Sequence, residues 1–215
     1  MMTKTSLLQA EFEFYKNHRE HYSQFGQDIL ALYLTEFKTD GYFVEFGASD
    51  GIENSNTLLL EREYNWTGIL AEPQSSYLPA LYDNRTCHTD SRCVYTESNS
   101  VIEFQESSTS GHSGIKEFFP WDTGIRSYYV PTVSLGDLLD GYEVPEHIDY
   151  MSVDTEGSEF EILNAYDFSR TFGLITVEHN HHQENRKKLF DLMTRKGYKR
   201  IFESVSNVDD YYIPA

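Results

Sequence analysis

The sequence is poor in cysteine, in basic residues and in long apolar runs. Its 215 residues include only Cys87 and Cys93, too few for a disulfide framework or a four-cysteine zinc site. There are 17 Lys and Arg against 35 Asp and Glu, a net charge of −18. This excess of negative charge argues against a protein that binds nucleic-acid phosphates or an anionic membrane surface. The apolar runs are far shorter than the roughly 20 residues that span a bilayer, so no membrane insertion is expected.

The rest of the composition is that of a folded domain. Aromatic residues make up 15% of the chain, more than disordered acidic segments contain, and the length fits one domain with a sizeable core. Residues 1–10 hold one lysine and no long apolar core, so we expect no signal peptide. A cytoplasmic protein is therefore expected, and the sequence gives no indication of its oligomeric state.

The order of apolar and turn residues predicts an α/β fold. The first forty residues predict two helices, and from Gly41 onward short apolar runs alternate with helix-length segments. Such alternation is typical of a mostly parallel sheet with helices on both faces. The predicted strands are 42–46, 68–73, 93–97, 148–154, 174–178, 199–204 and 210–213, and the helices after residue 40 are 55–64, 76–84, 158–165 and 184–196. We expect an N-terminal helical extension at 1–40, packed on a core domain of 41–215.

Residues 98–130 interrupt this alternation. They are rich in Ser, Thr and Gly and predict a long loop that closes over the site like a lid. Its aromatic residues either touch a ligand or pack the loop down; they are Phe118, Phe119, Trp121, Tyr128 and Tyr129. Ser113 in this loop is a candidate substrate-binding residue.

A glycine turn follows the first predicted strand. Gly47 and Gly51 are spaced G-x-x-x-G and are accompanied by the acids Glu45 and Asp50. A dinucleotide-binding turn has the spacing G-x-G-x-x-G and holds a pyrophosphate, which these acids would repel. Acids suit a cofactor with an ammonium and a sulfonium group. The turn therefore favours S-adenosylmethionine and counts against a dinucleotide-dependent sugar oxidoreductase.

Glu72 ends the second predicted strand of the core domain. An acid at this place is the expected partner of the ribose hydroxyls of a nucleoside cofactor. Taken alone, a glutamate at a strand end is more often a solvated charge. Its distance along the chain from the glycine turn favours the interpretation that Glu72 binds the ribose.

Together these features resemble the FkbM family of S-adenosylmethionine-dependent methyltransferases. The similar segments are 23–28, 43–51, 55–57, 68–73, 111–115, 148–157 and 176–179. The resemblance implies a Rossmann-like class I methyltransferase fold with a seven-stranded sheet whose last strand is antiparallel. It also implies O-methylation of a hydroxyl on a sugar, such as a glycan or a deoxysugar like rhamnose, or on a polyketide-type molecule. Some glycan-modifying relatives are fused to glycosyltransferases, including in large algal viruses, so a glycosyltransferase domain or partner is a candidate.

The resemblance also implies which residues bind the cofactor. The candidates are Gln24, Gln27, Glu45, Gly47, Ser49, Asp50, Ser55, Asn56, Glu72, Asp90 and Ser91. Gln24 and Gln27 would lie over the methionine end or tie the N-terminal helix to the sheet. Ser55 and Asn56 would contact the cofactor or cap the following helix. Asp90 and Ser91 are candidates for the adenine.

Asp154 is the first candidate for catalysis. It ends a predicted strand, where open α/β sheets bind their ligands. An aliphatic hydroxyl is a poor nucleophile, so a group must orient it or remove its proton, and we assign that role to Asp154. Glu156 either assists as a substrate-binding residue or caps the helix that follows.

Glu178, His179 and His181 follow the next predicted strand. Carboxylate and imidazole suit a divalent metal, but the spacing is not that of a helical metal motif, and we favour a metal-free active-site loop. Glu178 is a candidate substrate-binding residue. His179 or His181 is a candidate general base, because an imidazole titrates near neutral pH.

The sequence thus predicts an O-methyltransferase that acts on a sugar hydroxyl. The alternatives are a non-catalytic small-molecule-binding module of the same fold and a methyltransferase for a non-sugar hydroxyl. An assay of methyl transfer distinguishes the enzyme from the binding module. The identity of the acceptor distinguishes a sugar methyltransferase from one for a non-sugar hydroxyl.

Overall fold

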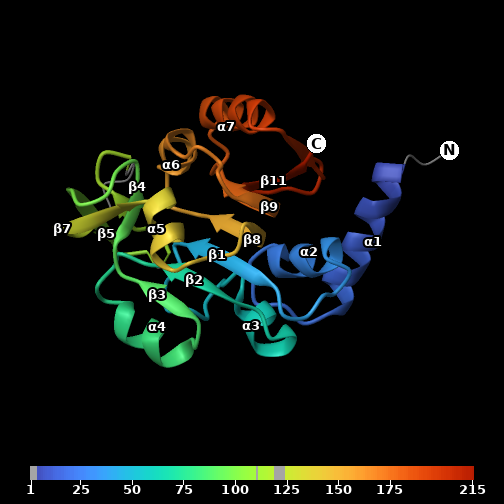
Figure 1. Ribbon diagram of the computed structural model, residues 1–215, viewed down its shortest axis with the longest axis horizontal. Coiled ribbons are helices and arrows are strands. Elements are labelled where there is room, and N and C mark those ends of the chain that lie inside the picture. Colours follow the sequence, from blue (N-terminus) through green and yellow to red (C-terminus); the bar gives the residue numbers. More distant parts are fainter. Residues whose placement is uncertain (1–3, 110, 119–123) are drawn as a thin grey trace.

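The computed structural model describes residues 4–109, 111–118 and 124–215, and its centre is a seven-stranded sheet (Figure 1). The strands of this sheet are β1 (Tyr42–Phe46), β2 (Thr67–Ala71), β3 (His88–Asp90), β8 (His147–Val153), β9 (Thr171–Glu178), β10 (Tyr198–Ile201) and β11 (Asp209–Pro214). Their order is β10-β11-β9-β8-β1-β2-β3. The strands from β3 to β9 pair in parallel, and β11 is antiparallel to both of its neighbours. The predicted fold class is confirmed, including the antiparallel last strand.

Helices cover both faces of the sheet because its strands are apolar on both sides. Val44 and Phe46 pack on one face, and Phe43 packs on the other. The first face is covered by α5 (Leu135–Gly141), α6 (Glu159–Ala165) and α7 (Gln183–Arg195). The second face is covered by α1 (Lys4–His18), α2 (Gln27–Leu34), α3 (Leu58–Tyr64) and α4 (Leu78–Asn84). The parallel strands are thus shielded from water everywhere except at their ends.

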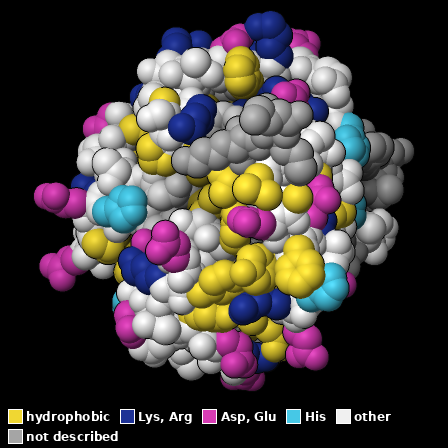
Figure 2. Space-filling view, turned by 90° about the vertical axis from the view of Figure 1, so that its right-hand side faces the viewer, with side chains coloured by type: hydrophobic (Ala, Val, Ile, Leu, Met, Phe, Trp, Pro, Cys, Tyr) yellow, Lys and Arg dark blue, Asp and Glu magenta, His cyan; other side chains and the backbone are white. Residues whose placement is uncertain are grey.

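The two predicted N-terminal helices, α1 and α2, lie against the second face. Phe12 of α1 is buried and stacks on Phe202, with ring centroids 5.8 Å apart. The outer side of α1 stays open, since Leu7 and Phe14 are 52% and 56% exposed, and hydrophobic side chains are visible on this face of the molecule (Figure 2). No helix in the described ranges has the length and apolar character to cross a membrane.

Residues 98–130 form strands where the sequence predicts a loop. They contribute β5 (Val101–Ser107), β6 (Gly114–Ile115) and most of β7 (Gly124–Ser134), which join β4 (Cys93–Tyr95) in a second, four-stranded sheet. Phe104, Ile115 and Val130 bury a small core of their own, which the many Ser, Thr and Gly residues conceal in the sequence. Tyr128 packs on Phe104 and Tyr129 is 72% exposed, while Phe119 and Trp121 lie outside the described residues.

Two short elements of the structure have no counterpart in the prediction. β3 is three residues long and polar, and α5 is a seven-residue helix that begins where Ser134 accepts a hydrogen bond from the backbone N–H of Asp137. The predicted strand 93–97 exists as β4, but it belongs to the second sheet. Elements this short carry too little hydrophobic periodicity to be found in a sequence.

Candidate active site

Four parallel strands end at one edge of the main sheet, and a cavity opens there. Gly47 follows β1, Glu72 follows β2, Asp154 follows β8 and Glu178 ends β9, and all four line this cavity. Ligands of open α/β sheets bind outside the carboxyl ends of the strands because the loops that follow diverge there. The fold therefore brings together residues more than 100 positions apart in the chain.

The glycine turn and Glu72 form one rigid unit. Gly47 has φ +76°, and a Cβ at this position would overlap the backbone oxygen of Asp154, so only glycine fits. The backbone N–H of Ser49 donates to Glu72 Oε2 at 2.8 Å, and that of Gln74 donates to Oε1 at 2.7 Å. The carboxylate is thus held in a fixed orientation between two loops.

The pKa of Glu72 is higher than that of an ordinary glutamate. It is 5% exposed, and burial raises its pKa to about 7, against the two backbone N–H groups that lower it. The nearby Glu106 raises the pKa further. A carboxylate that is held in place and poorly solvated is suited to accept hydrogen bonds from a ligand.

Glu45 supports the wall of the cavity. Its carboxylate accepts hydrogen bonds from the backbone N–H of Asn56 at 2.8 Å, from the hydroxyl of Ser55 at 3.2 Å and from the hydroxyl of Thr57. Burial raises the pKa of Glu45, and Arg85 opposes that shift. Glu45 lines the cavity as predicted, but its oxygens hold the loop before α3.

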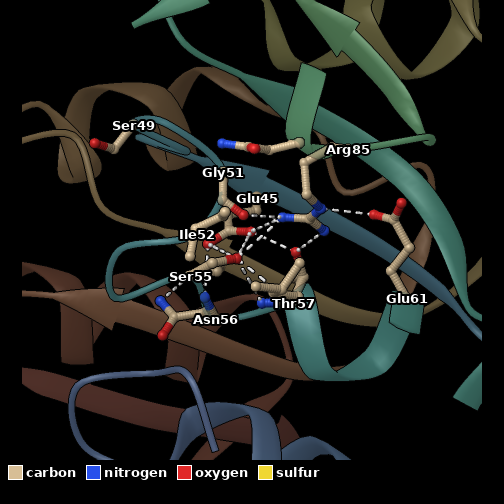
Figure 3. Close-up of polar contacts among 12 residues, drawn as sticks. Glu45, Ser49, Gly51, Ile52, Ser55, Asn56, Thr57, Glu61 and Arg85 are labelled. Carbon is tan, nitrogen blue, oxygen red and sulfur yellow. Dashed lines mark hydrogen bonds and ion pairs between the residues drawn. The ribbon is translucent and has the colours of Figure 1, made fainter. Parts of the chain in front are cut away.

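Arg85 completes this support from the end of α4 (Figure 3). Its side chain is fully buried, and its Nη1 lies 3.9 Å from Glu45 Oε2. The guanidinium donates to the backbone oxygen of Gly51, to the hydroxyls of Ser55 and Thr57, and to Glu61. Although burial acts in the opposite direction, Arg85 helps to lower the pKa of Glu61 to about 2. One cation thus neutralises two buried acids and fixes the loop between β1 and α3.

Three further acids meet at the opposite side of the cavity without such a cation. One ligand oxygen from each of Asp154, Glu156 and Glu178 lies within 4.8 Å of the others. Asn180 donates to Glu178 at 2.8 Å and to Glu156 at 3.1 Å. Burial and the neighbouring carboxylates raise the pKa of Asp154 and of Glu178 well above the ordinary values, and burial raises that of Glu156 to about 7. We call these three residues the acid cluster.

The loop before α6 is held by Glu159 and not by Glu156. Glu159 accepts hydrogen bonds from the backbone N–H groups of Thr155 at 3.0 Å and Gly157 at 2.9 Å. Glu156 has φ +57°, and its side chain contacts Asn180 and lines the cavity. Of the two roles that the sequence allows for Glu156, helix capping is therefore wrong.

The family model of the methyltransferase FkbM domain matches residues 45–200. This chain belongs to the FkbM methyltransferase family. It is thus an S-adenosylmethionine-dependent methyltransferase. The order of the strands independently shows the class I fold. The match covers the residues at all four strand ends of the cavity.

Two solved structures resemble this chain at low sequence identity. A precorrin-6Y C5,15-methyltransferase from Geobacter metallireducens GS-15 is 14% identical, with a TM-score of 0.44 over 86% of this chain and 85% of that chain. A methyltransferase from Pyrococcus furiosus is 11% identical, with a TM-score of 0.44 over 95% and 96% of the two chains. No curated protein matches the sequence.

Most of the predicted cofactor residues of the FkbM methyltransferase line the cavity. These are Gln24, Glu45, Gly47, Ser49, Ser55, Asn56 and Glu72, together with the predicted substrate residues Ser113, Glu156 and Glu178. Four others do not line it. Gln27 donates to Asp209 of β11 at 2.5 Å, so it ties α2 to the sheet, which is the structural alternative that the sequence allows.

The remaining three predicted cofactor residues are placed elsewhere by local contacts. Asp50 accepts hydrogen bonds from the backbone N–H groups of Ile52 and Glu53 and thereby closes its own turn. Asp90 forms an ion pair with Arg92 at 2.6 Å, and Ser91 is exposed beside it. Within the described residues, none of these three lines the cavity.

The two predicted catalytic histidines lie beside the cavity and not in its wall. His179 is buried, its Nδ1 accepts a hydrogen bond from the backbone N–H of His181, and burial lowers its pKa. His181 is exposed. The backbone turns after Glu178, since Asn180 and His181 both have positive φ, and neither imidazole is part of the cavity wall.

Several residues of the cavity and its support carry no signal in the sequence. They are Asn54, Gln74, Tyr77, Arg85 and Asn180. Arg85 stands in the triplet Asn84-Arg85-Thr86, which has the spelling of a glycosylation site and gives no hint of a buried cation. The only indication for Arg85 is that it is a basic residue at the end of a predicted helix in a strongly acidic chain.

Proposed function

We propose that this protein is an O-methyltransferase whose acceptor is a hydroxyl of a neutral sugar. The observation that supports this most directly is the position of the acid cluster. It lies at the same sheet edge as the Gly47 turn and Glu72, so a cofactor and an acceptor can meet there.

The residues around Gly47 fit S-adenosylmethionine. Gly47 lines the cavity without a side chain, and the oriented carboxylate of Glu72 can accept hydrogen bonds from a ribose diol. When bound, this cofactor supplies a methyl group whose bond to sulfur breaks as the acceptor oxygen attacks, leaving a neutral thioether. The acids of the cavity favour the cationic cofactor over its neutral product.

Asp154 is the proposed catalytic residue. Burial and the charges of Glu156 and Asp209 raise its pKa, and a carboxylate with a raised pKa is a better acceptor for a hydroxyl proton than an ordinary one. Glu156 and Glu178 line the cavity beside it and offer further acceptors for the hydroxyls of a sugar.

The charge of the cavity supports a neutral acceptor. Within the described residues, no lysine or arginine forms an ion pair with the acid cluster, so a phosphorylated or carboxylated acceptor would meet uncompensated negative charge. A sugar hydroxyl avoids this repulsion and can donate to the carboxylates. The same cavity would also tolerate a neutral polyketide-type hydroxyl, and the acceptor panel below includes one.

The cofactor is tested by titration calorimetry with S-adenosylmethionine and S-adenosylhomocysteine. We expect binding by the intact protein, and weaker binding by Glu72→Gln. Glu146→Gln is the matched control, because it removes one carboxylate from the exposed surface. Absence of binding by the unaltered protein would overturn the proposed function.

The acceptor is tested by methyl transfer from labelled cofactor to neutral sugars, deoxysugars and a non-sugar alcohol. We expect transfer to a sugar that Asp154→Asn abolishes and Glu146→Gln retains. Transfer to the non-sugar alcohol alone would replace the sugar with a polyketide-type acceptor. Cofactor binding without transfer to any of them would favour a binding module of the same fold.

A further inference from the structure

The acid cluster has the ligand set of a site for a hard divalent cation. Asp154, Glu156 and Glu178 come from the end of β8, from the following turn and from the end of β9, and their ligand oxygens lie within 4.8 Å of one another. All three residues also line the cavity at the carboxyl ends of the strands. Oxygen donors of this kind suit Mg²⁺ and Mn²⁺.

A second observation in the same cavity also indicates a missing partner. Asn56 is 8% exposed, its Nδ2 donates to Ser152 at 2.8 Å, and within the described residues its Oδ1 accepts no hydrogen bond. Leaving a buried amide oxygen without a partner is unfavourable, so the site favours a ligand that supplies one.

The direction of this amide is consistent with a ligand in the cavity. Asn56 lines the same cavity as the acid cluster, and its carboxamide points away from the guanidinium of Arg85 (Figure 3). Ser152 is the last residue but one of β8, and Asp154 follows directly after that strand. Asn56 thus offers a neutral oxygen donor, of a type that Mg²⁺ accepts, in the wall of the cavity that the three carboxylates also line.

We propose that the acid cluster binds one Mg²⁺ or Mn²⁺ ion, with Asn56 contributing a neutral oxygen at the same site. The ion would neutralise the carboxylates, which have no buried arginine of the kind that Glu45 and Glu61 share. Its role in catalysis rests on the proposed function. The ion would bind the acceptor hydroxyl and raise its acidity, and the proton would still pass to Asp154, as in the proposed function, before the oxygen attacks.

The test is direct binding of Mn²⁺ to the intact protein after removal of metals with EDTA. Electron paramagnetic resonance reports free Mn²⁺, and a thermal melt with added MgCl₂ or MnCl₂ at constant ionic strength reports stabilisation. We expect one saturable Mn²⁺ site, competition by Mg²⁺ and a rise in Tm. The variants Asp154→Asn and Glu178→Gln should each weaken Mn²⁺ binding by about tenfold or more, and Asn56→Ala by less.

Two controls keep the result specific. Glu146→Gln loses the same charge at the surface and should bind Mn²⁺ as the unaltered protein does. The Tm of each variant in EDTA reports folding, and removal of one repelling carboxylate should leave it equal or higher. Absence of a Mn²⁺ site in the unaltered protein, or equal affinity in Asp154→Asn and Glu178→Gln, would overturn the metal site.

Failure of the metal site and failure of the proposed function give different results. If the protein binds S-adenosylmethionine and methylates a sugar in EDTA, the catalytic role of the ion is wrong and the proposed function stands. If Mn²⁺ binds at the acid cluster but no hydroxyl is methylated with metal present, the metal site stands and the proposed function fails.

Discussion

The protein treats two groups of acids in opposite ways. Glu45 and Glu61 share the buried guanidinium of Arg85, and Glu45 bonds the loop before α3. The acid cluster has no such cation within the described residues, and its carboxylates contact one another and Asn180. The pKa of Glu61 is about 2, whereas that of Glu156 is about 7.

The difference separates the acids that serve the scaffold from those that we propose serve a ligand. A buried carboxylate with an internal cation is satisfied by folding alone. Carboxylates that repel one another make folding less favourable, and they are relieved only by protons or by a cation from outside. The same composition therefore builds a support at one end of the cavity and a binding site at the other.

The largest effect is expected from removal of the shared cation. Arg85→Met leaves Glu45 and Glu61 buried without a counter-charge, and we expect the free energy of unfolding to fall by about 3–5 kcal/mol in urea titrations. The matched control is Arg92→Met, because the ion pair of Arg92 with Asp90 is partly exposed, and a loss within about 1 kcal/mol is expected there. Equal losses in the two variants would contradict the role of Arg85.

The next effect concerns turnover and not stability. Asp154→Asn keeps the shape of the side chain but removes its charge, and we expect the rate of methyl transfer to fall on the order of 10²–10⁴-fold. Its thermal stability in EDTA should not decrease, because one of three repelling carboxylates is gone. Retention of full turnover by this variant would remove Asp154 from the chemistry.

Glu72 gives the pH dependence of cofactor binding. Its pKa is raised to about 7, so the charged form that accepts the ribose hydroxyls is lost as the pH falls through 7. We expect the affinity for S-adenosylmethionine to be constant above that pH and to fall by about tenfold per unit below it. Calorimetry across this range should show that Glu72→Gln binds more weakly and lacks this step. A Glu72→Gln variant that keeps the step would assign it to another group.

The smallest effect is expected at His181. It is exposed and lies outside the wall of the cavity, so His181→Ala should change the rate of methyl transfer by less than about threefold. A loss as large as that of Asp154→Asn would restore His181 as a general base and extend the site beyond the acid cluster.

Most of the fold could be predicted from the sequence because its strands are strongly apolar and end in turn residues. β1 and β2 are found almost to the residue, whereas the second sheet is missed because its few apolar residues are scattered among Ser, Thr and Gly. Gly47, Glu72 and Asp154 could be identified for the same reason, since each directly follows a clear strand.

The sequence by itself determined the strand ends, and hence which residues stand at the edge of the sheet, because hydrophobic periodicity is a local property. Only the tertiary structure decided which acids receive a cation. Arg85 reaches Glu45 across 40 positions of the chain, and Asp154 and Glu178 share a cavity whose wall does not include His179 and His181. Charge compensation depends on distances of a few ångströms between residues remote in sequence, and no local pattern encodes them.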